Sequence, residues 1–350
     1  MQLADFWKIF LITTQYSSAL ISLLLNSILI LLILFRSPPN LGNYKYLMLY
    51  IVIFQIVYSI WDVITEPTIL SYGPAFFIFR KFKTSVFGRE KSFFLLIVFC
   101  GLFGVSLAMF AIHFVYRYGA ISKEFRDKYL SGRKIYILFS IPILYGTIWT
   151  TICGLFFHFT PNTDKFARGL LLDTYDTRIE DLSYVIVWFY PEDQHKETHP
   201  DWRIFFAISF MWGLIISSLF CVIFFGFNCY TQLSRALVTT RMASKTTKSL
   251  QQQLFLALVV QTVIPVILMY IPVAILYSFP MAHVDAGYLG SFIAATVAVY
   301  PAIDPLPTMF IVKNFRETIL CRRRPKAKEE LNPEPPNINA ELSVARPTSF

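Results

Sequence analysis

The sequence predicts an all-α membrane protein built as a bundle of seven transmembrane helices. Of its 350 residues, 55% are hydrophobic and only 15% are charged, whereas soluble domains average about 45–50% apolar and about 25% charged residues. The apolar excess gathers in seven long runs with very few charges, and each is close to the roughly 20 residues that a helix needs to cross a bilayer. The alternating pattern of a membrane β-barrel, the other fold that satisfies every backbone group in lipid, is absent.

The seven apolar runs follow one another along the chain, and no internal repeat relates them. They are Phe10–Phe35, Tyr46–Leu70, Ser92–Val115, Ile135–Phe157, Ile204–Tyr230, Leu254–Phe279 and Tyr288–Val312. The first run is too long for the apolar core of a signal peptide, and no small-residue cleavage site follows it. We therefore expect it to remain as the first span of a bundle covering residues 10–312, preceded by a short extracellular segment, residues 1–9.

Basic residues indicate which ends of the spans face the cytoplasm, because Lys and Arg are enriched in cytoplasmic loops. With the N-terminus placed outside, the inner loops and the proximal tail hold 19 Lys and Arg residues, and the outer segments hold 11. This bias predicts an extracellular N-terminus and a cytoplasmic C-terminus. The basic outer loop Arg80–Lys91 argues in the opposite direction. Since the net charge of +9 collects in loops beside a membrane, it does not indicate nucleic-acid binding.

Three segments outside the spans have compositions of their own. The outer segment His158–Trp202 is acidic and contains an apolar patch, Tyr184–Tyr190, that could pack as a strand or as a lid over the helix ends. Residues 313–324 follow the last span as a juxtamembrane segment that ends in three arginines. Residues 325–350 are rich in Pro, Glu and Asn and poor in aromatic residues, which is typical of a disordered tail.

The last span is the most irregular of the seven, because its one charged residue, Asp304, lies among prolines that include Pro301 and Pro305. An ionisable side chain at this depth is costly in lipid, so Asp304 should face protein or water. Proline cannot donate to the helix ladder, so we expect a kink near Asp304. Pro265 and Pro272 predict kinks in the sixth span for the same reason.

Three polar side chains on different spans fall at nearly one depth. At 1.5 Å per residue, Asp304 lies about 12 Å from the inner edge of its span, and Asn26 and Gln55 each lie about 13.5 Å from theirs. Each would be costly alone in a dry interior. We therefore predict an intramembrane polar cluster in which Asn26 and Gln55 donate amide hydrogens to the Asp304 carboxyl. The rival interpretation is that Asp304 only bonds backbone groups freed by the nearby prolines.

Arg117 occurs at the inner end of the third span, in the sequence His113-Phe114-Val115-Tyr116-Arg117-Tyr118. One interpretation is an arginine at the membrane edge whose stem lies in lipid and whose charge reaches water. The functional interpretation is a switch, with His113 and Tyr116 beside it, that holds the inner helix ends together and meets a partner when they separate.

Two further positions are candidates for function. Asp62 and Glu66 share one face of the second span, and Asp62 would lie in its outer half, where it could line the mouth of a ligand site. Glu66, followed by Pro67, is better explained as the end of the helix. Cys321 follows the juxtamembrane stretch and precedes three arginines, so it is either a free thiol or a site of reversible palmitoylation.

Four stretches resemble the nematode seven-transmembrane chemoreceptors of the serpentine receptor class r, or Str, family. They are LGNYKYLMLY after the first span, IHFVYRYGA after the third, KSLQQQLFLALVVQTVIPVILMYIP in the sixth and YPAIDPLPTMFIVKNFRETI in the seventh. Together they extend the resemblance over Phe10–Leu320. It implies an odorant or other chemical receptor that signals through a heterotrimeric G protein, in the plasma membrane and in the cilium of a sensory neuron.

The match to rhodopsin-like receptors is partial. Arg117 lacks the acidic residue that usually precedes it, because Tyr116 stands there, and Asp304-Pro305 occupies the place of an Asn-Pro pair. Cys100 and Cys153 both fall inside spans, and no cysteine lies in an outer loop. The usual disulfide between the third span and the second outer loop is therefore not expected.

The favoured hypothesis is a receptor that binds a small, volatile or apolar molecule in the outer half of a bundle of the kind found in G-protein-coupled receptors, and that signals to a heterotrimeric G protein. The alternative is a seven-span channel or transporter, which would need a polar stripe through several spans. Spans four, five and six offer almost none. A membrane enzyme would need clustered histidines and acids at one depth, whereas the histidines are scattered. We expect no metal, no cofactor and no enzymatic activity.

Overall fold

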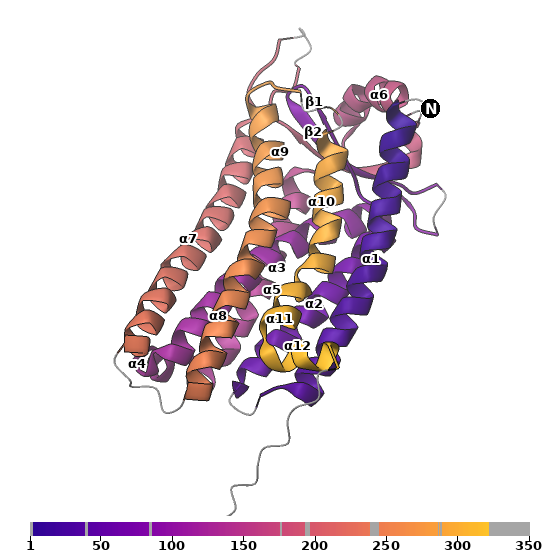
Figure 1. Ribbon diagram of the computed structural model, residues 1–350. Helices are drawn as coiled ribbons and strands as arrows, with labels where there is room; N and C mark the ends of the chain where they lie inside the picture. Colours follow the sequence, from indigo (N-terminus) through magenta and orange to yellow (C-terminus); the bar gives the residue numbers. More distant parts are fainter. Residues whose placement is uncertain are drawn as a thin grey trace, which may run out of the picture.

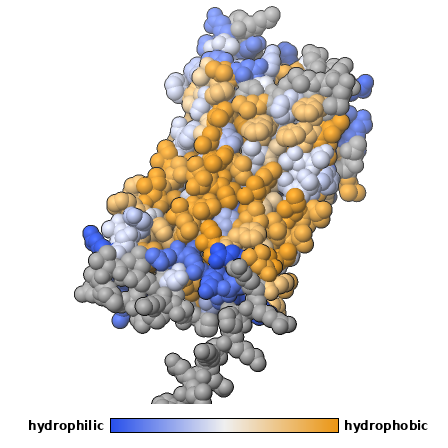
Figure 2. All heavy atoms as spheres, in the orientation of Figure 1, coloured by the Kyte–Doolittle hydropathy of each residue, from blue (hydrophilic) through white to orange (hydrophobic). Residues whose placement is uncertain are grey.

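The computed structural model contains a bundle of long helices with a small sheet at one end. It describes residues 3–38, 41–83, 86–175, 177–192, 197–238, 245–285, 287 and 289–321. Helix α1 begins at the end that carries β1, β2 and α6, whereas α4 and α12 lie at the opposite end (Figure 1). A broad hydrophobic band crosses the visible face between two more hydrophilic ends (Figure 2), as a protein that crosses a bilayer requires.

Seven membrane-spanning stretches occur among the described residues, as the sequence predicts. They are formed by α1 (Leu3–Arg36), α2 (Tyr44–Thr65), α3 (Arg89–Ile121), α5 (Lys134–Phe156), α7 (Trp202–Val238), α8 with η4 and α9 (Lys245–Met281), and α10 with α11 (Leu289–Ile311). Several helices extend beyond their apolar runs, and α1 begins at Leu3 rather than at Phe10. The most enclosed of these helices is α3, in which 78% of the residues of the most apolar stretch are buried inside the structure.

The predicted second span is wrong at its outer end. Helix α2 stops at Thr65, and Glu66 adopts a left-handed conformation with φ of 45°. Pro67 explains the stop, because its ring disfavours helical geometry in the residue before it. The chain then enters β1 (Thr68–Tyr72) instead of continuing as a helix to Leu70.

Prolines interrupt the last two spans. In the sixth, α8 (Lys245–Pro265) ends at Pro265 and is followed by a π-helical turn, η4 (Val266–Tyr270), and by α9 (Ile271–Met281), which has Pro272 in its first turn. In the seventh, α10 (Leu289–Ile303) contains Pro301, and α11 (Pro305–Ile311) begins at Pro305. Such turns mark places where a helix bends.

A three-stranded antiparallel sheet covers the end of the bundle at which α1 begins, the end that the sequence predicts to face outward (Figure 1). Strand β2 (Ala75–Lys81) pairs with β1 on one side and with β3 (Leu182–Trp188) on the other, and Phe77 lies opposite both Leu70 and Ile186. Strand β3 contains most of the apolar patch that the sequence singled out as a strand or lid. All of its residues are buried.

Both faces of this sheet are covered, because its side chains alternate between two hydrophobic cores. One face, including Phe76, Val185 and Val187, joins the core of the bundle. The other face, including Phe77 and Tyr184, packs with α6 (Pro161–Tyr175) and forms a second, smaller core. We call the sheet and α6 together the outer roof.

Short elements complete the structure. They are α4 (Lys123–Phe125) and η2 (Arg126–Leu130) in the second inner loop, η3 (Ile179–Asp181) before β3, and α12 (Lys313–Ile319) after the last span. Phe315 anchors α12 to the bundle as a fully buried side chain. The predicted disordered tail, residues 325–350, lies outside the described residues.

Candidate functional site

Arg117 is buried inside the bundle and does not reach out from its edge. Only 1% of its surface is exposed, and its Nη2 donates a hydrogen bond of 2.7 Å to the backbone carbonyl of Gln251 on α8. The guanidinium also lies 5.3 Å from the centre of the Tyr44 ring on α2. Arg117 therefore connects α3 to both α2 and α8 at the end of the bundle that carries α12.

The charge of Arg117 has no acidic partner among the described residues. Its Nε lacks a hydrogen-bond partner there, and its guanidinium borders a cavity of about 300 Å³ together with Tyr116, Arg126 and Gln251. Its partners are the Gln251 carbonyl and the face of the Tyr44 ring, which are weaker partners for a buried cation than a carboxylate.

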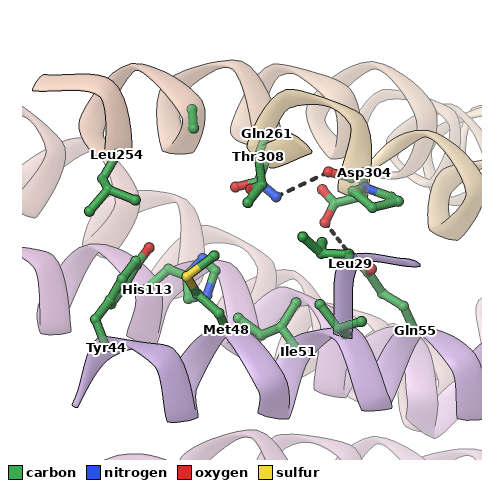
Figure 3. A pocket seen from close by; sticks show the side chains of 13 residues that line it. Leu29, Tyr44, Met48, Ile51, Gln55, His113, Leu254, Gln261, Asp304 and Thr308 are labelled. Atoms are coloured by element: carbon green, nitrogen blue, oxygen red, sulfur yellow. Dashed lines mark hydrogen bonds between the residues drawn. The ribbon is translucent and has the colours of Figure 1, made fainter. Parts of the chain in front are cut away.

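A small cavity joins this end of the bundle to its middle. It has a volume of about 20 Å³, enough for about one water molecule, and Tyr44, His113, Gln55 and Asp304 all face it (Figure 3). His113 is buried, and its Nε2 has no hydrogen-bond partner among the described residues. The structure therefore places His113 between Arg117 and the polar residues around Asp304.

Asp304 lies at the break between α10 and α11 and is 3% exposed. The Gln55 amide nitrogen donates to its Oδ2 and also approaches the Tyr300 hydroxyl at 3.5 Å. Asp304 thus faces the protein interior, where it links the seventh span to α2.

Asn26 reaches the same region but does not contact the Asp304 carboxyl. Its Nδ2 donates to the Pro301 carbonyl at 3.0 Å and to the Ser22 carbonyl at 2.9 Å. In a regular helix the Pro301 carbonyl would accept from the nitrogen of residue 305, and Pro305 has no N–H to give. Asn26 fills that place, so the predicted bond from Asn26 to the Asp304 carboxyl is not formed, whereas the one from Gln55 is. The rival interpretation is also wrong in its residue, because Asn26 and not Asp304 bonds the carbonyl freed by proline.

Gln261 is a further member of this cluster that the sequence reasoning missed. Its Nε2 donates to the backbone carbonyl of Asp304 at 3.0 Å, and the bond is visible in Figure 3. The same depth count that selected Gln55 would have found it, since Gln261 is an isolated amide in an apolar run. We use the term midplane cluster for Asn26, Gln55, Gln261, Tyr300 and Asp304. It joins α1, α2 and α8 to the seventh span.

A second cavity lies beneath the outer roof. It has a volume of about 50 Å³ and is almost entirely apolar. Its walls come from α2, α3, α5, α9, α10 and two strands, and they include Tyr58, Phe103, Trp149, Val273, Tyr277 and Ile78. The rings of Phe103 and Trp149 are 5.3 Å apart, and Phe76 of the roof stacks on Tyr277 at 5.5 Å. We call this space the outer cavity.

Asp62 and Glu66 occupy different environments at the outer end of α2. Asp62 is 3% exposed, and its Oδ1 has no hydrogen-bond partner among the described residues. It lies one helical turn beyond Tyr58 and is not part of the wall of the outer cavity. Glu66 caps the helix and accepts a hydrogen bond of 2.6 Å from Tyr16.

Charged side chains fasten the roof to α3. Arg89 in the first turn of α3 forms a two-pronged ion pair with Asp164 of α6, with nitrogen–oxygen distances of 2.5 and 3.2 Å. The Tyr184 hydroxyl donates to the same carboxylate at 2.7 Å, and the Arg89 guanidinium lies 3.9 Å from the centre of the Phe159 ring. Partial burial of Asp164 opposes ionisation, but Arg89 and Tyr184 outweigh it and lower the pKa of Asp164.

These contacts lie where a disulfide would otherwise join the third span to the second outer loop. Cys100 and Cys153 are free and buried within α3 and α5. At the other end of the chain, Cys321 is free and exposed just after α12, where a membrane-associated enzyme could reach its thiol.

Comparison with known proteins gives one consistent result. Residues 11–320 match the family described as serpentine type 7TM GPCR chemoreceptor Str. The chain is 37% identical over 304 residues to G-protein coupled receptor str-217 of Caenorhabditis elegans, which covers 87% of each protein. It is 27% identical over 351 residues to serpentine receptor class r-10 of the same species, which covers 96% of this chain and 98% of the relative. A Caenorhabditis briggsae serpentine receptor class r-10 is 28% identical over 316 residues, 87% of this chain and 89% of the relative.

Family membership supports a role as a G-protein-coupled receptor and not as an enzyme, and it agrees with seven spans in a multi-pass membrane protein. The resemblance that the sequence motifs indicate is therefore confirmed over nearly the whole bundle. The chain belongs to the Str family of seven-transmembrane chemoreceptors.

Proposed function

We propose that this protein is an olfactory chemoreceptor that binds a small, apolar and volatile molecule in the outer cavity. A heterotrimeric G protein engages the opposite end of the bundle, at Arg117. The single observation that carries the proposal is the arrangement of α8 and α9. One continuous span contributes Val273 and Tyr277 to the outer cavity, Gln261 to the midplane cluster and Gln251 to the bond with Arg117.

The outer cavity, at about 50 Å³, is smaller than most ligand pockets, which hold about 300–1,000 Å³. A ligand therefore enlarges it by moving its walls. The wall with a built-in bend is α9, because the π-helical turn Val266–Tyr270 separates it from α8. Displacing α9 shifts α8, and with it the Gln251 carbonyl that holds Arg117. The released guanidinium can then meet a G protein, which is a two-state rearrangement biased by the ligand.

The midplane cluster supports this mechanism over a channel or transporter. Gln55 bonds to the Asp304 carboxylate, Gln261 bonds to the Asp304 carbonyl, and Asn26 bonds to the Pro301 carbonyl, which Pro305 leaves without a donor. Such a cluster fastens helices together, whereas a permeation path requires polar groups along the length of the bundle. Asp62 contributes to ligand binding in this proposal only after the outer cavity has expanded toward it.

The proposed orientation has the N-terminus and the roof outside the cell and α12 in the cytoplasm, in the plasma membrane of a sensory cilium. Two of the basic residues of the outer loop, which weaken the charge bias, have acidic partners in α6 and η3. Arg89 pairs with Asp164, and Lys83 pairs with Asp181 at 3.0 Å. On the inner side we propose that Cys321 is palmitoylated. Acyl-exchange labelling that is equal for the wild type and for Cys321→Ser would show that it is a free thiol.

A ligand screen with a matched pair of variants tests the proposed site. Cells expressing the receptor are exposed to a panel of small apolar volatiles, and calcium or cyclic nucleotide is recorded. For any active compound, Val273→Trp should abolish the response because it fills the outer cavity, whereas Ile271→Trp, two residues away and exposed on the lipid side, should preserve it. Equal responses from both variants at matched surface expression would rule out this cavity as the ligand site.

A further inference from the structure

A long apolar groove runs between α7 and α8 on the lipid-facing side of the bundle. It has a volume of about 720 Å³ and belongs to neither the outer cavity nor the midplane cluster. Its walls include Val222, Gly226 and Phe227 of α7 and Phe255, Val259 and Val263 of α8, and Phe114 of α3 closes its floor. At Gly226 α7 packs closely on this floor, since a Cβ there would meet the Phe114 ring at 3.2 Å. We call it the α7–α8 groove.

The length of the groove matches one half of a bilayer. Along α7 it extends from Val222 to Ser234, and along α8 from Gln252 to Val266, which correspond to about 18 and 21 Å at 1.5 Å per residue. The hydrocarbon core of a bilayer is about 30 Å thick, so one leaflet contributes about half of that. The groove therefore begins near the headgroups on the α12 side and ends near the middle of the membrane.

The walls of the groove are polar at the end near the headgroups and apolar toward the middle of the membrane. Ser234 and Gln252 border the end of the groove nearest to α12. The remaining lining is almost wholly aliphatic or aromatic. Arg235, exposed on the next position of α7, adds a positive charge at that end. In addition, the stretch from Leu233 to Gln253 contains no acidic residue. A molecule with an anionic head and one long apolar chain fits this pattern.

We propose that the α7–α8 groove binds one acyl chain of an anionic phospholipid whose headgroup lies beside Ser234, Gln252 and Arg235. In the orientation proposed above, this lipid belongs to the cytoplasmic leaflet. The chain packs against the turn of α8 that contains Gln251 and Gln252, so it supports the position in which the Gln251 carbonyl accepts from Arg117. The lipid is thus a structural partner of the inner end of the receptor.

Photocrosslinking in nanodiscs tests this inference without a ligand or a G protein, so its outcome is independent of the proposed function. The full-length receptor is reconstituted with phosphatidylserine that carries a diazirine in its acyl chain, and adducts are mapped by mass spectrometry. We expect the peptides spanning residues 222–234 and 252–266 to carry several times more adducts than the lipid-exposed face of α5. Equal labelling of all lipid-facing helices would overturn the proposal.

Two variants on α8 make the result specific to the groove. Val263 lines the groove, and Ile267 is comparably exposed one turn further on but lies outside its lining. Val263→Trp should abolish the excess labelling, and Ile267→Trp should retain it. If Val263→Trp does not fold, Val259→Trp fills the groove from another exposed position of the α8 wall. Excess labelling that survives a folded groove-filling variant would contradict the proposed site.

The variant Arg235→Gln tests whether the headgroup of the bound lipid is anionic and lies beside Arg235. Equimolar photoreactive phosphatidylserine and phosphatidylcholine are allowed to compete for the groove, and the ratio of their adducts is measured. Removing one basic residue near an anionic headgroup should reduce the preference for phosphatidylserine about fivefold. An unchanged ratio would show that the groove takes acyl chains without selecting anionic lipids, which contradicts this part of the proposal.

Discussion

Arg117 donates to a backbone carbonyl, so the side chain of Gln251 is not what holds it. We predict that Arg117→Ala reduces ligand-evoked signalling while surface expression persists, because the released cation is the group that would meet the G protein. Gln251→Ala is the matched control, since it keeps the carbonyl and should signal normally. If Arg117→Ala signals at the wild-type level at equal surface expression, Arg117 contributes to packing and not to G-protein coupling.

Asp304 allows a second prediction at the scale of single residues. Asp304→Asn retains an oxygen that can accept from the Gln55 amide, whereas Asp304→Ala leaves that buried donor with only the distant Tyr300 hydroxyl, at 3.5 Å. An unsatisfied buried group costs about 1–3 kcal/mol, so Asp304→Ala should lower the thermal stability of the purified receptor, and its folding yield, more than Asp304→Asn does. The prediction fails if the two variants melt at the same temperature.

The midplane cluster also shows how far single residues can be read from the sequence. Depth along each helix was sufficient to select Asn26, Gln55 and Asp304 as neighbours. It could not tell that Asn26 points to the Pro301 carbonyl and Gln55 to the carboxylate, because that depends on the rotation of each helix about its own axis. Gln261 carries the same signal of depth as Gln55, because it is an isolated amide in the apolar run of the sixth span.

At the scale of elements, Gly290 controls how closely β1 approaches α10. A Cβ at this position would lie 2.5 Å from the Ile69 carbonyl oxygen, a backbone atom that cannot turn aside. We predict that Gly290→Ala pushes β1 away from α10 and destabilises the receptor by about 1–3 kcal/mol. Gly213→Ala on α7, where nothing lies within 4 Å, is the control, and both are measured by thermal unfolding in detergent.

The ion pair between Arg89 and Asp164 should supply part of the attachment of the roof. Both side chains are about three-quarters buried, so a double-mutant cycle with Arg89→Ala and Asp164→Ala should give a coupling of about 1 kcal/mol. Glu180→Gln, which removes an exposed pair with Arg168, should leave stability unchanged. A coupling indistinguishable from zero would show that the roof is held by its apolar cores alone.

The same pair implies a direction for the effect of acid. Because the folded-state pKa of Asp164 is lowered, its contribution to stability is complete above the unfolded pKa, about 3.9, and is lost as the pH falls below that value. Arg89 and Tyr184, the groups that favour its ionised form, supply this contribution. The loss of stability on acidification should therefore be smaller in Asp164→Asn than in the wild type.

Elements outside the spans were the least predictable from the sequence. The apolar patch in the acidic outer segment indicated a strand or lid, but its partners β1 and β2 were hidden in the end of the second run and in a basic loop. Long-range pairing between residues about a hundred positions apart leaves no local periodicity. The seven spans, by contrast, could be located from the sequence, apart from the end of the second, because lipid requires a long apolar run in every span.

For the whole molecule, the proposed topology makes a direct prediction. Epitope tags are placed at the two ends of the chain and stained in intact and in permeabilised cells. We expect the N-terminal tag to be visible in intact cells and the C-terminal tag only after permeabilisation, because the inner loops and tail carry the larger share of Lys and Arg. Staining of the C-terminal tag in intact cells would reverse the orientation.

The order of the strands along the chain has a consequence for biosynthesis. Strands β1 and β2 leave the ribosome as a hairpin between the second and third spans, and β3 follows only after α3, α5 and α6 have been made. Until then the edge of β2 that pairs with β3 has no partner, and an uncovered strand edge is where chains aggregate. The sheet can therefore be completed only once the chain has been synthesised as far as β3, so the hairpin of β1 and β2 keeps an open edge while α3, α5 and α6 are made.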